Sequence, residues 1–343
     1  VLAGAVDDYG MSYYFRGNVE NNYVQFANKC WRIVRITGDG SIKLVLHNDN
    51  VNNVASPCAS SNNSYDAAFA RYSGTTYETK YNEQYNDNAY VGFMYGTAGA
   101  STYAKTHANT NKSTILQNLE TWYKNNLASY ESKLADTIWC NDKSTKTNQT
   151  ITKTSLDTTT NTLDKYSNNY PGLGYGTNST LYSGGPRART NYYYTKISNT
   201  RYGTAGTGPT LICLLDNDEG KLSKLTVSDT TNGNGALDYK IGLLTIDEVL
   251  YAGSIDEYSF RALNYYSSSI NSYLIENAEN RYWTLSPRNF DNAADVLVVS
   301  GFFGLAIDNR VTAGNGLRPA VSLTSATTIS GGNGTSSNPF VVN

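Results

Sequence analysis

Histidine, proline and net charge are all scarce in this chain of 343 residues, which has 2 His, 7 Pro and a formal net charge of −2. His47 and His107 lie far apart, and neither has a G-x-S-x-G beside it, so acyl-transfer catalysis lacks its usual base. Each histidine is therefore expected to be a surface residue or a satisfied polar residue. The near-neutral charge gives no reason to expect nucleic acid as a partner.

The chain also lacks any run of about 18 apolar residues, so no segment of it is expected to span a bilayer. Its first residues, VLAGAV, are too short for the core of a signal peptide, although removal of a signal or an anchor would leave such an end. We therefore expect contact with a membrane only through an anchor that precedes Val1.

Cysteine is limited to Cys30, Cys58, Cys140 and Cys213. None lies in a C-x-x-C and no histidine is near, which argues against zinc. An even number of cysteines in a polar chain favours two disulfides formed in an oxidising compartment. Four cysteines allow three pairings, and we favour Cys30–Cys58 with Cys140–Cys213. The alternative is a reduced cytosolic protein with buried thiols.

Two acidic clusters are the candidates for a metal site or for glycoside hydrolysis, namely residues 216–220 and the pair Asp247-Glu248. The first is more simply an acidic turn. The second fits the start of a helix, where the helix dipole favours acids. No cluster has the spacing of an EF-hand loop. We expect no metal, no cofactor and no enzymatic activity.

Tyrosine and glycine dominate the composition, with 29 of each. Tyr combined with Ser, Gly and Asn is the chemistry of adaptable contact surfaces. Two interpretations stay open: a secreted Tyr-rich β protein with polar loops, or a surface dedicated to binding.

Periodicity predicts a meander at the start of the chain, with strand-like residues 12–16 and 23–36, a turn at Gly38-Asp39-Gly40 and a return strand over 41–46. A helix is expected over about 113–134, capped by Ser113 or Thr114. A shorter helix over 245–251 has Thr245 and Glu248 at capping-box spacing.

The most informative stretch covers residues 281–323. Ser286-Pro287 suggests a corner, and β-branched runs between Gly and Asn predict strand, turn, strand, loop and strand. Phe302-Phe303 at the turn is either a core plug or part of an exposed cluster with Phe290, Ile307 and Arg310. Arg318, wedged before Pro319, is expected to form a buried scaffold pair.

Several segments together resemble a family of uncharacterised surface proteins from Gram-positive gut bacteria. They are Tyr13-Tyr14-Phe15-Arg16-Gly17, Val19-Glu20-Asn21-Asn22-Tyr23-Val24, Trp31-Arg32-Ile33-Val34-Arg35-Ile36, Gly38-Asp39-Gly40, Trp122-Tyr123, Cys140-Asn141-Asp142, Ile241-Gly242-Leu243, Asp247-Glu248-Val249, Ala252-Gly253, Tyr282-Trp283-Thr284-Leu285-Ser286-Pro287 and Gly316-Leu317-Arg318-Pro319. They span most of the chain in the expected order. Members of this kind often begin with a membrane or prepilin-like helix, which would precede Val1.

The C-terminal segment of that family is similar to the C-type lectin fold shared by formylglycine-generating enzymes and by the variable proteins of diversity-generating retroelements. By position, the resemblance implies that the ligand-binding residues are Arg288, Asn289, Phe290, Asp291, Ser300, Phe302, Phe303, Ile307, Asp308, Asn309, Arg310, Thr312 and Asn315. Two differences between this chain and those proteins limit the resemblance. No cysteine follows Cys213, so the oxidase activity is not carried over. Residues 139–142 (Trp-Cys-Asn-Asp) only echo a calcium–sugar motif and lie upstream of its place.

We therefore expect an α+β, C-type-lectin-like domain, with mostly antiparallel short strands, one or two helices and long Tyr/Asn/Ser/Thr-rich insertions. Residues 1–11 are expected to be a leader or linker, 12–325 the domain with insertions at about 50–110 and 143–208, and 326–343 a β-hairpin tail. The expected function is binding of a protein or glycan on another cell or host surface, at the bacterial cell surface. The alternative is a pilin-like subunit that self-associates into filaments, and an enzyme is the weakest interpretation.

Overall fold

The computed structural model describes residues 2–146, 151–156, 163–168, 173–177, 183–184, 186, 208–216, 220–256, 272–301 and 305–343. Over these residues the chain is a mixed α+β protein that consists mostly of strands with few helices. No helix among them is both long and apolar enough to cross a membrane.

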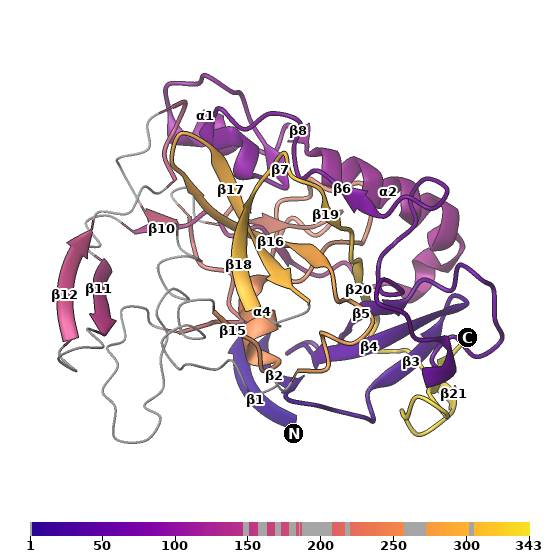
Figure 1. Ribbon diagram of the computed structural model, residues 1–343. Coiled ribbons are helices and arrows are strands. Elements are labelled where there is room, and N and C mark those ends of the chain that lie inside the picture. Colours follow the sequence, from indigo (N-terminus) through magenta and orange to yellow (C-terminus); the bar gives the residue numbers. More distant parts are fainter. Residues whose placement is uncertain are drawn as a thin grey trace.

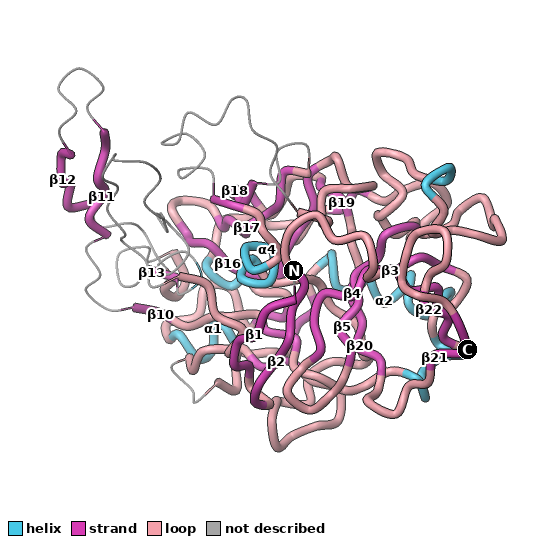
Figure 2. Tube along the Cα trace, turned by 90° about the horizontal axis from the view of Figure 1, so that it is seen from below, coloured by secondary structure: helices cyan, strands magenta, loops and turns pink. Residues whose placement is uncertain are grey.

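The larger sheet has eight strands and is formed by both ends of the described chain (Figures 1 and 2). Its order is β1 (Leu2–Asp7), β2 (Gly10–Phe15), β4 (Lys29–Ile36), β3 (Tyr23–Phe26), β22 (Phe340–Val342) and β21 (Ile329–Gly331), and β4 also pairs with β5 (Ile42–Asn48), which pairs with β20 (Ala320–Leu323). The expected leader thus contains a strand of this sheet. The predicted tail hairpin is present, and it joins the same sheet because β22 pairs in parallel with β3.

The opening meander is confirmed with one difference. Residues 23–36 form two antiparallel strands, because the backbone turns at Ala27 and Asn28, where φ is 53° and 57°. Two consecutive residues in the left-handed region give the tight hairpin turn that matches strand twist. The apolar alternation of the stretch did not reveal this turn.

The second sheet has six strands and carries most of the C-terminal stretch. Its order is β15 (Ile255–Asp256), β18 (Leu305–Arg310), β17 (Ala294–Ser300), β16 (Arg281–Phe290), β19 (Asn315–Gly316) and β6 (Glu78–Thr79). The predicted strands before and after residues 301–304 are present as β17 and β18, while 302–304 lie outside the described residues. Ser286-Pro287 lies inside β16, next to a shift of register, instead of at a corner. The short helix α4 (Ile246–Tyr251) packs against β16, β17 and β18.

The predicted main helix is α2 (Thr114–Asn126), and the Ser113 side chain accepts a hydrogen bond from the Leu116 amide at its start. It ends earlier than expected and continues as the 3-10 turn η3 (Ala128–Lys133). Trp31 and Trp122 meet edge to face at 6.2 Å in the core. The apolar face of α2 is therefore core, as its pattern indicates.

Short elements complete the fold: α1 (Tyr103–His107), η1 (Ser60–Asn62), η2 (Asn88–Val91), and the two-stranded pairs β7 (Met94–Tyr95) with β8 (Asn111–Lys112), β9 (Trp139–Cys140) with β14 (Lys224–Leu225), β10 (Thr145–Lys146) with β13 (Ser183–Gly184), and β11 (Ile151–Leu156) with β12 (Leu163–Asn168). The region expected as an insertion at 50–110 contributes side chains to the core, since Phe69, Tyr81 and Phe93 are fully buried there. Much of the insertion expected at 143–208 lies outside the described residues.

Candidate functional site

The β17–β18 hairpin carries the centre of the predicted binding face. Successive residues of a strand point to opposite faces. Asp308 and Arg310 therefore share one side of β18, whereas Ile307, which packs against the core, and Asn309 share the other. On the first side, Arg288 Nη1 of β16 donates to Asp308 Oδ2 at 2.8 Å. The predicted residues are thus divided between two faces of the sheet.

An arginine and a tyrosine form the exposed part of this surface. The Arg310 side chain is exposed, and its guanidinium carbon lies 5.0 Å from the centroid of the Tyr85 ring, which is itself 42% exposed. The carbonyl of Tyr85 accepts a hydrogen bond of 2.8 Å from the Ala294 amide, which fixes the tyrosine beside the start of β17. Tyr85 was not among the predicted residues, because it lies about 200 positions upstream in a Tyr-rich loop.

The remaining predicted residues differ widely in exposure. Asp291 is exposed and Thr312 is half-buried. Asn289, Phe290, Ser300 and Asn315 are buried, so their side chains have little surface to offer a ligand. Phe302 and Phe303 lie outside the described residues.

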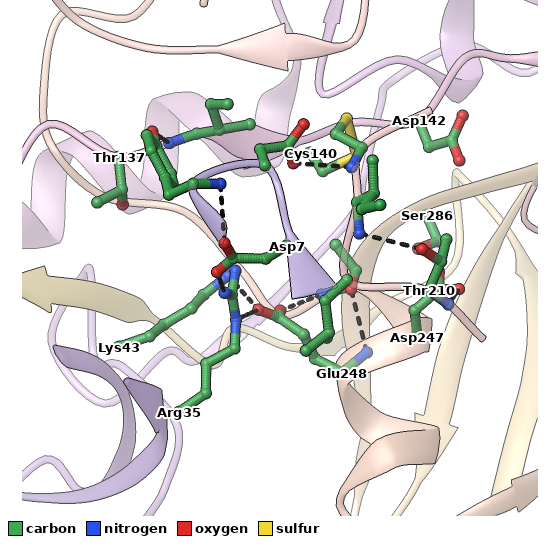
Figure 3. Close-up of a pocket in the computed structure, with 17 residues that line it drawn as sticks. Asp7, Arg35, Lys43, Thr137, Cys140, Asp142, Thr210, Asp247, Glu248 and Ser286 are labelled. Atoms are coloured by element: carbon green, nitrogen blue, oxygen red, sulfur yellow. Dashed lines mark hydrogen bonds and ion pairs between the residues drawn. A yellow bond between two sulfur atoms is a disulfide. The ribbon is translucent and has the colours of Figure 1, made fainter. Parts of the chain in front are cut away.

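A pocket rich in charged residues lies between the start of the larger sheet and α4 (Figure 3). Its acidic centre is Glu248, whose Oε1 accepts from Lys43 Nζ at 2.6 Å and from Arg35 Nε at 3.0 Å. Arg35 also binds the Asp7 carboxylate. The Cys140–Cys213 disulfide forms part of the pocket wall. The two disulfides, Cys30–Cys58 and Cys140–Cys213, are the pairs favoured from the sequence.

Burial and charge compete in setting the pKa of Glu248. Burial alone would raise the pKa, but the neighbouring Lys43 and Arg35 outweigh it and hold the pKa at about 2. Burial lowers the pKa of Lys43, against the attraction of Glu248. Glu248 also closes the predicted capping box with Thr245. The carboxylate is therefore a permanent anion that joins a helix start to the sheet.

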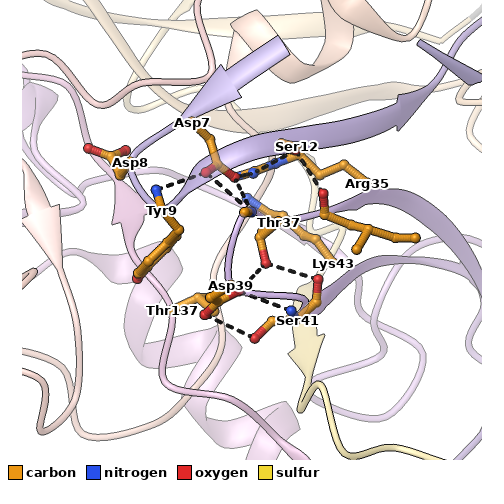
Figure 4. Close-up of polar contacts among 12 residues, drawn as sticks. Asp7, Asp8, Tyr9, Ser12, Arg35, Thr37, Asp39, Ser41, Lys43 and Thr137 are labelled. Carbon is orange, nitrogen blue, oxygen red and sulfur yellow. Dashed lines mark hydrogen bonds and ion pairs between the residues drawn. The ribbon is translucent and has the colours of Figure 1, made fainter. Parts of the chain in front are cut away.

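Polar partners also surround Asp7 (Figure 4). Its carboxylate accepts from the amides of Tyr9 at 2.8 Å and Gly38 at 3.2 Å. Nearby, Asp39 accepts from the Ser41 amide at 3.0 Å and from the Thr37 hydroxyl at 2.5 Å. The pocket holds only about 20 Å³, which is room for about one water molecule. These contacts and this size fit an interior ionic network better than a substrate site.

Both histidines are buried, so neither is a surface residue; each has a polar partner at Nε2, in line with the other alternative that the sequence suggested. His107 Nε2 lies 2.8 Å from the Gly174 carbonyl oxygen, and burial lowers its pKa to about 3. His47 Nε2 lies 3.2 Å from Asn277 Nδ2, and burial places its pKa well below the usual value. Each ring is neutral at physiological pH.

The echo of a calcium–sugar motif is interior structure. Asn141 is buried; its Oδ1 accepts from the Phe93 amide at 3.0 Å and its Nδ2 donates to the Leu285 carbonyl at 2.7 Å. Over the described ranges, no group of three or more His, Cys, Asp or Glu residues is placed to hold a metal ion. Arg318 is buried as expected, but its Nε donates to the Leu46 carbonyl, with the guanidinium 5.0 Å from the Tyr282 ring, rather than to a carboxylate.

A wider hollow of about 350 Å³ was not singled out from the sequence. It lies beside the end of β5, and its lining includes five asparagines, Asn48, Asn50, Asn52, Asn62 and Asn63. The density of asparagine over these positions was the only sequence signal for it. Comparison with protein-family models, with curated proteins and with solved structures found no match for this chain.

Proposed function

We propose that this protein is a secreted or surface-displayed binding protein, and that it contacts a protein or glycan ligand with the side of the β17–β18 hairpin that carries Asp308 and Arg310, together with Arg288 of the neighbouring β16. The observation that carries the proposal is the Arg310–Tyr85 pair, an exposed arginine beside an exposed aromatic ring. Tyr and Arg are the residues that most often anchor interfaces.

The surroundings of this pair support a preformed surface. Arg310 lies at the end of a strand and not in a free loop. The neighbouring Arg288–Asp308 contact of 2.8 Å holds two more charged side chains in place. Side chains ordered before binding lose less conformational entropy when a ligand arrives.

The C-type-lectin-like scaffold belongs to the same proposal. It is supported by the antiparallel order of β16, β17 and β18 and by their position near the C-terminus. The extracellular location is supported by the two disulfides, which are typical of oxidising compartments.

The test is a screen against arrayed proteins and glycans with the native chain and a Tyr85→Ala/Arg310→Ser variant. Lys133→Ser is the control, since Lys133 is an exposed cation in η3, beside the end of β20 in the larger sheet. Loss of a binding signal in the double variant alone supports the proposal. Equal signals from all three proteins would move the binding site away from the hairpin.

A second candidate function, a structural subunit of a filament, is favoured by a separate observation. Leu2, Val6, Met11, Tyr13 and Ile36 are all exposed. Val6 faces Met11 and Tyr13 faces Ile36 across neighbouring strands, so these apolar side chains are adjacent. β1 is also the end strand of the larger sheet. An end strand with an apolar face is a template for pairing with another chain.

Sedimentation and electron microscopy over a range of concentrations test this second function. Association that Val6→Lys abolishes and that Ile329→Lys leaves intact would favour the subunit, because Ile329 is an equally exposed residue at the other end of the sheet. A monomer at every concentration would count against it.

A further inference from the structure

We propose that the asparagine-lined hollow beside β5 is a second binding site, and that it takes a neutral saccharide. We call it the asparagine groove; its rims are residues 50–54 and 61–67, and its volume is about 350 Å³. This volume falls in the range of sites for small ligands. The site is distinct from the β17–β18 hairpin and does not depend on the function proposed there.

The first rim is held in shape by one side chain. Asn50 Nδ2 donates to the carbonyls of Asn28 at 2.8 Å and Val54 at 3.1 Å, and Asn50 Oδ1 accepts from the Val54 amide at 2.8 Å. Asn50 thus uses its side chain to close the loop onto itself and onto the β3–β4 turn. This rim needs no ligand to order it.

The second rim is tied to the floor of the groove. Asn48 Nδ2 donates to the Asn62 carbonyl at 3.0 Å, and Asn62 Nδ2 donates to the Ser56 carbonyl at 2.8 Å. The Cys30–Cys58 disulfide fastens the same segment to the start of β4. Both rims are therefore preformed, which lowers the entropy cost of binding.

The charges in the groove cancel. Its lining contains one acid and one base, Asp66 and Arg71, and their side chains pair at 2.8 Å. Arg71 Nη1 also donates to the Asp66 and Phe69 carbonyls, at 2.9 and 2.6 Å. A charged ligand would have to compete with this pair, whereas a neutral ligand would not.

The side chains left for a ligand are amides and hydroxyls. Asn52 and Ser61 line the groove and are exposed, and within the described part of the chain neither side chain has a protein hydrogen-bond partner. Such groups both donate and accept, as sugar hydroxyls do. Val51, which also lines the groove and is 58% exposed, offers apolar surface to the face of a sugar ring.

The probes are neutral trisaccharides of glucose, mannose and N-acetylglucosamine, with a sulfated trisaccharide and a short neutral peptide beside them. Binding to the full chain is followed by saturation-transfer NMR and calorimetry. Ser61→Trp fills the groove, and Ser60→Trp is its control, because Ser60 is an exposed neighbour in η1 that does not line the groove. Asn52→Ala removes one amide without breaking a protein hydrogen bond.

We expect at least one neutral trisaccharide to bind, with loss of binding in Ser61→Trp, weaker binding in Asn52→Ala, and native binding in Ser60→Trp and in the Tyr85→Ala/Arg310→Ser variant. The last result separates this site from the hairpin. Three results would overturn the proposal: no neutral trisaccharide binds, Ser61→Trp binds as the native chain does, or the sulfated sugar or the peptide binds more tightly than the neutral sugars.

Discussion

Glu248 Oε1 accepts a hydrogen bond of 2.6 Å from Lys43 Nζ, and this contact joins the first turn of α4 to strand β5 across 205 positions of the sequence. The other carboxylate oxygen accepts from the Thr245 amide at 3.0 Å. Both charged side chains are buried. Since a buried charge is costly without its partner, the contact fixes how the helix meets the sheet.

Removal of the Glu248 charge is expected to destabilise the protein strongly. Glu248→Gln leaves Lys43 and Arg35 without their shared anion, at a cost of about 3–5 kcal/mol in the free energy of unfolding. Urea unfolding of the native protein and the variant measures this loss. Glu83→Gln is the control, because its pair with Lys80 is exposed and such pairs contribute about 1 kcal/mol or less. Equal losses in the two variants would show that burial does not set the importance of the Glu248 pair.

Acidification is expected to destabilise the protein through its buried histidines. The pKa of His107 is about 3 when folded, against 6.5 as its ordinary value. The unfolded chain therefore binds a proton first as the pH falls, and stability is full above pH 6.5 and declines below it. Between pH 7 and 5 the loss from His107 is about 2 kcal/mol.

A His107→Gln variant isolates this contribution. It keeps His47, whose pKa burial also lowers, so stability should still decline below pH 6.5, but less steeply than in the native protein. Chemical unfolding at several pH values between 7 and 5 gives the slopes. Identical slopes would mean that His107 takes up its proton over the same pH range in the folded and the unfolded chain.

The buried Lys143 is expected to make the stability of the protein rise with pH, as the histidines do, but over a higher pH range. Its Nζ donates to the carbonyls of Met94 and His107 and to Asn109 Oδ1, at 2.8, 3.0 and 2.8 Å. Burial nevertheless lowers the pKa from 10.5 to about 7. The unfolded chain keeps its proton over this window, so stability should rise by about 2 kcal/mol between pH 7.5 and 9. Lys143→Met should be less stable and should lose this part of the rise, as unfolding measurements at the two pH values will show.

Local patterns predicted the local structure. The cap at Ser113, the capping box of Thr245 with Glu248, and the strands on either side of Gly38-Asp39-Gly40 all depend on residues a few positions apart. Such short-range chemistry is readable without knowledge of the fold. The double left-handed turn at Ala27-Asn28 was missed, because neither residue is the glycine that usually marks it.

The sites depend on contacts between distant segments and were predicted only in part. Arg310 was proposed from its position in the hairpin, but its partner Tyr85 comes from a loop with no distinctive pattern. Asp247-Glu248 was recognised as a helix start, whereas the ion pairs of Glu248 with Arg35 and Lys43 could be found only once the fold was known. The burial of His47 and His107 likewise results from packing between distant segments, which the sequence does not reveal.

Gly242 lies where the surrounding core leaves no space for a side chain. A Cβ at this position would lie 2.4 Å from a ring atom of Trp139, which is fully buried and has Lys43 Nζ 4.6 Å from the ring. The backbone cannot move away easily, because Gly242 and Ala320 exchange two hydrogen bonds of 3.1 and 2.8 Å. Gly242→Ala should therefore cost about 1–3 kcal/mol, the usual range for overpacking a core.

The control for this change is Gly331→Ala, since a Cβ there meets nothing within 4 Å. Thermal unfolding of both variants beside the native protein makes the comparison, and the Gly331→Ala midpoint should stay near the native one. Tryptophan fluorescence of Gly242→Ala should also change, because the extra methyl group displaces Trp139. A Gly242→Ala protein with native stability and native fluorescence would show that Trp139 and the strand beside it adapt freely, and the tight contact would then not help to fix this part of the core.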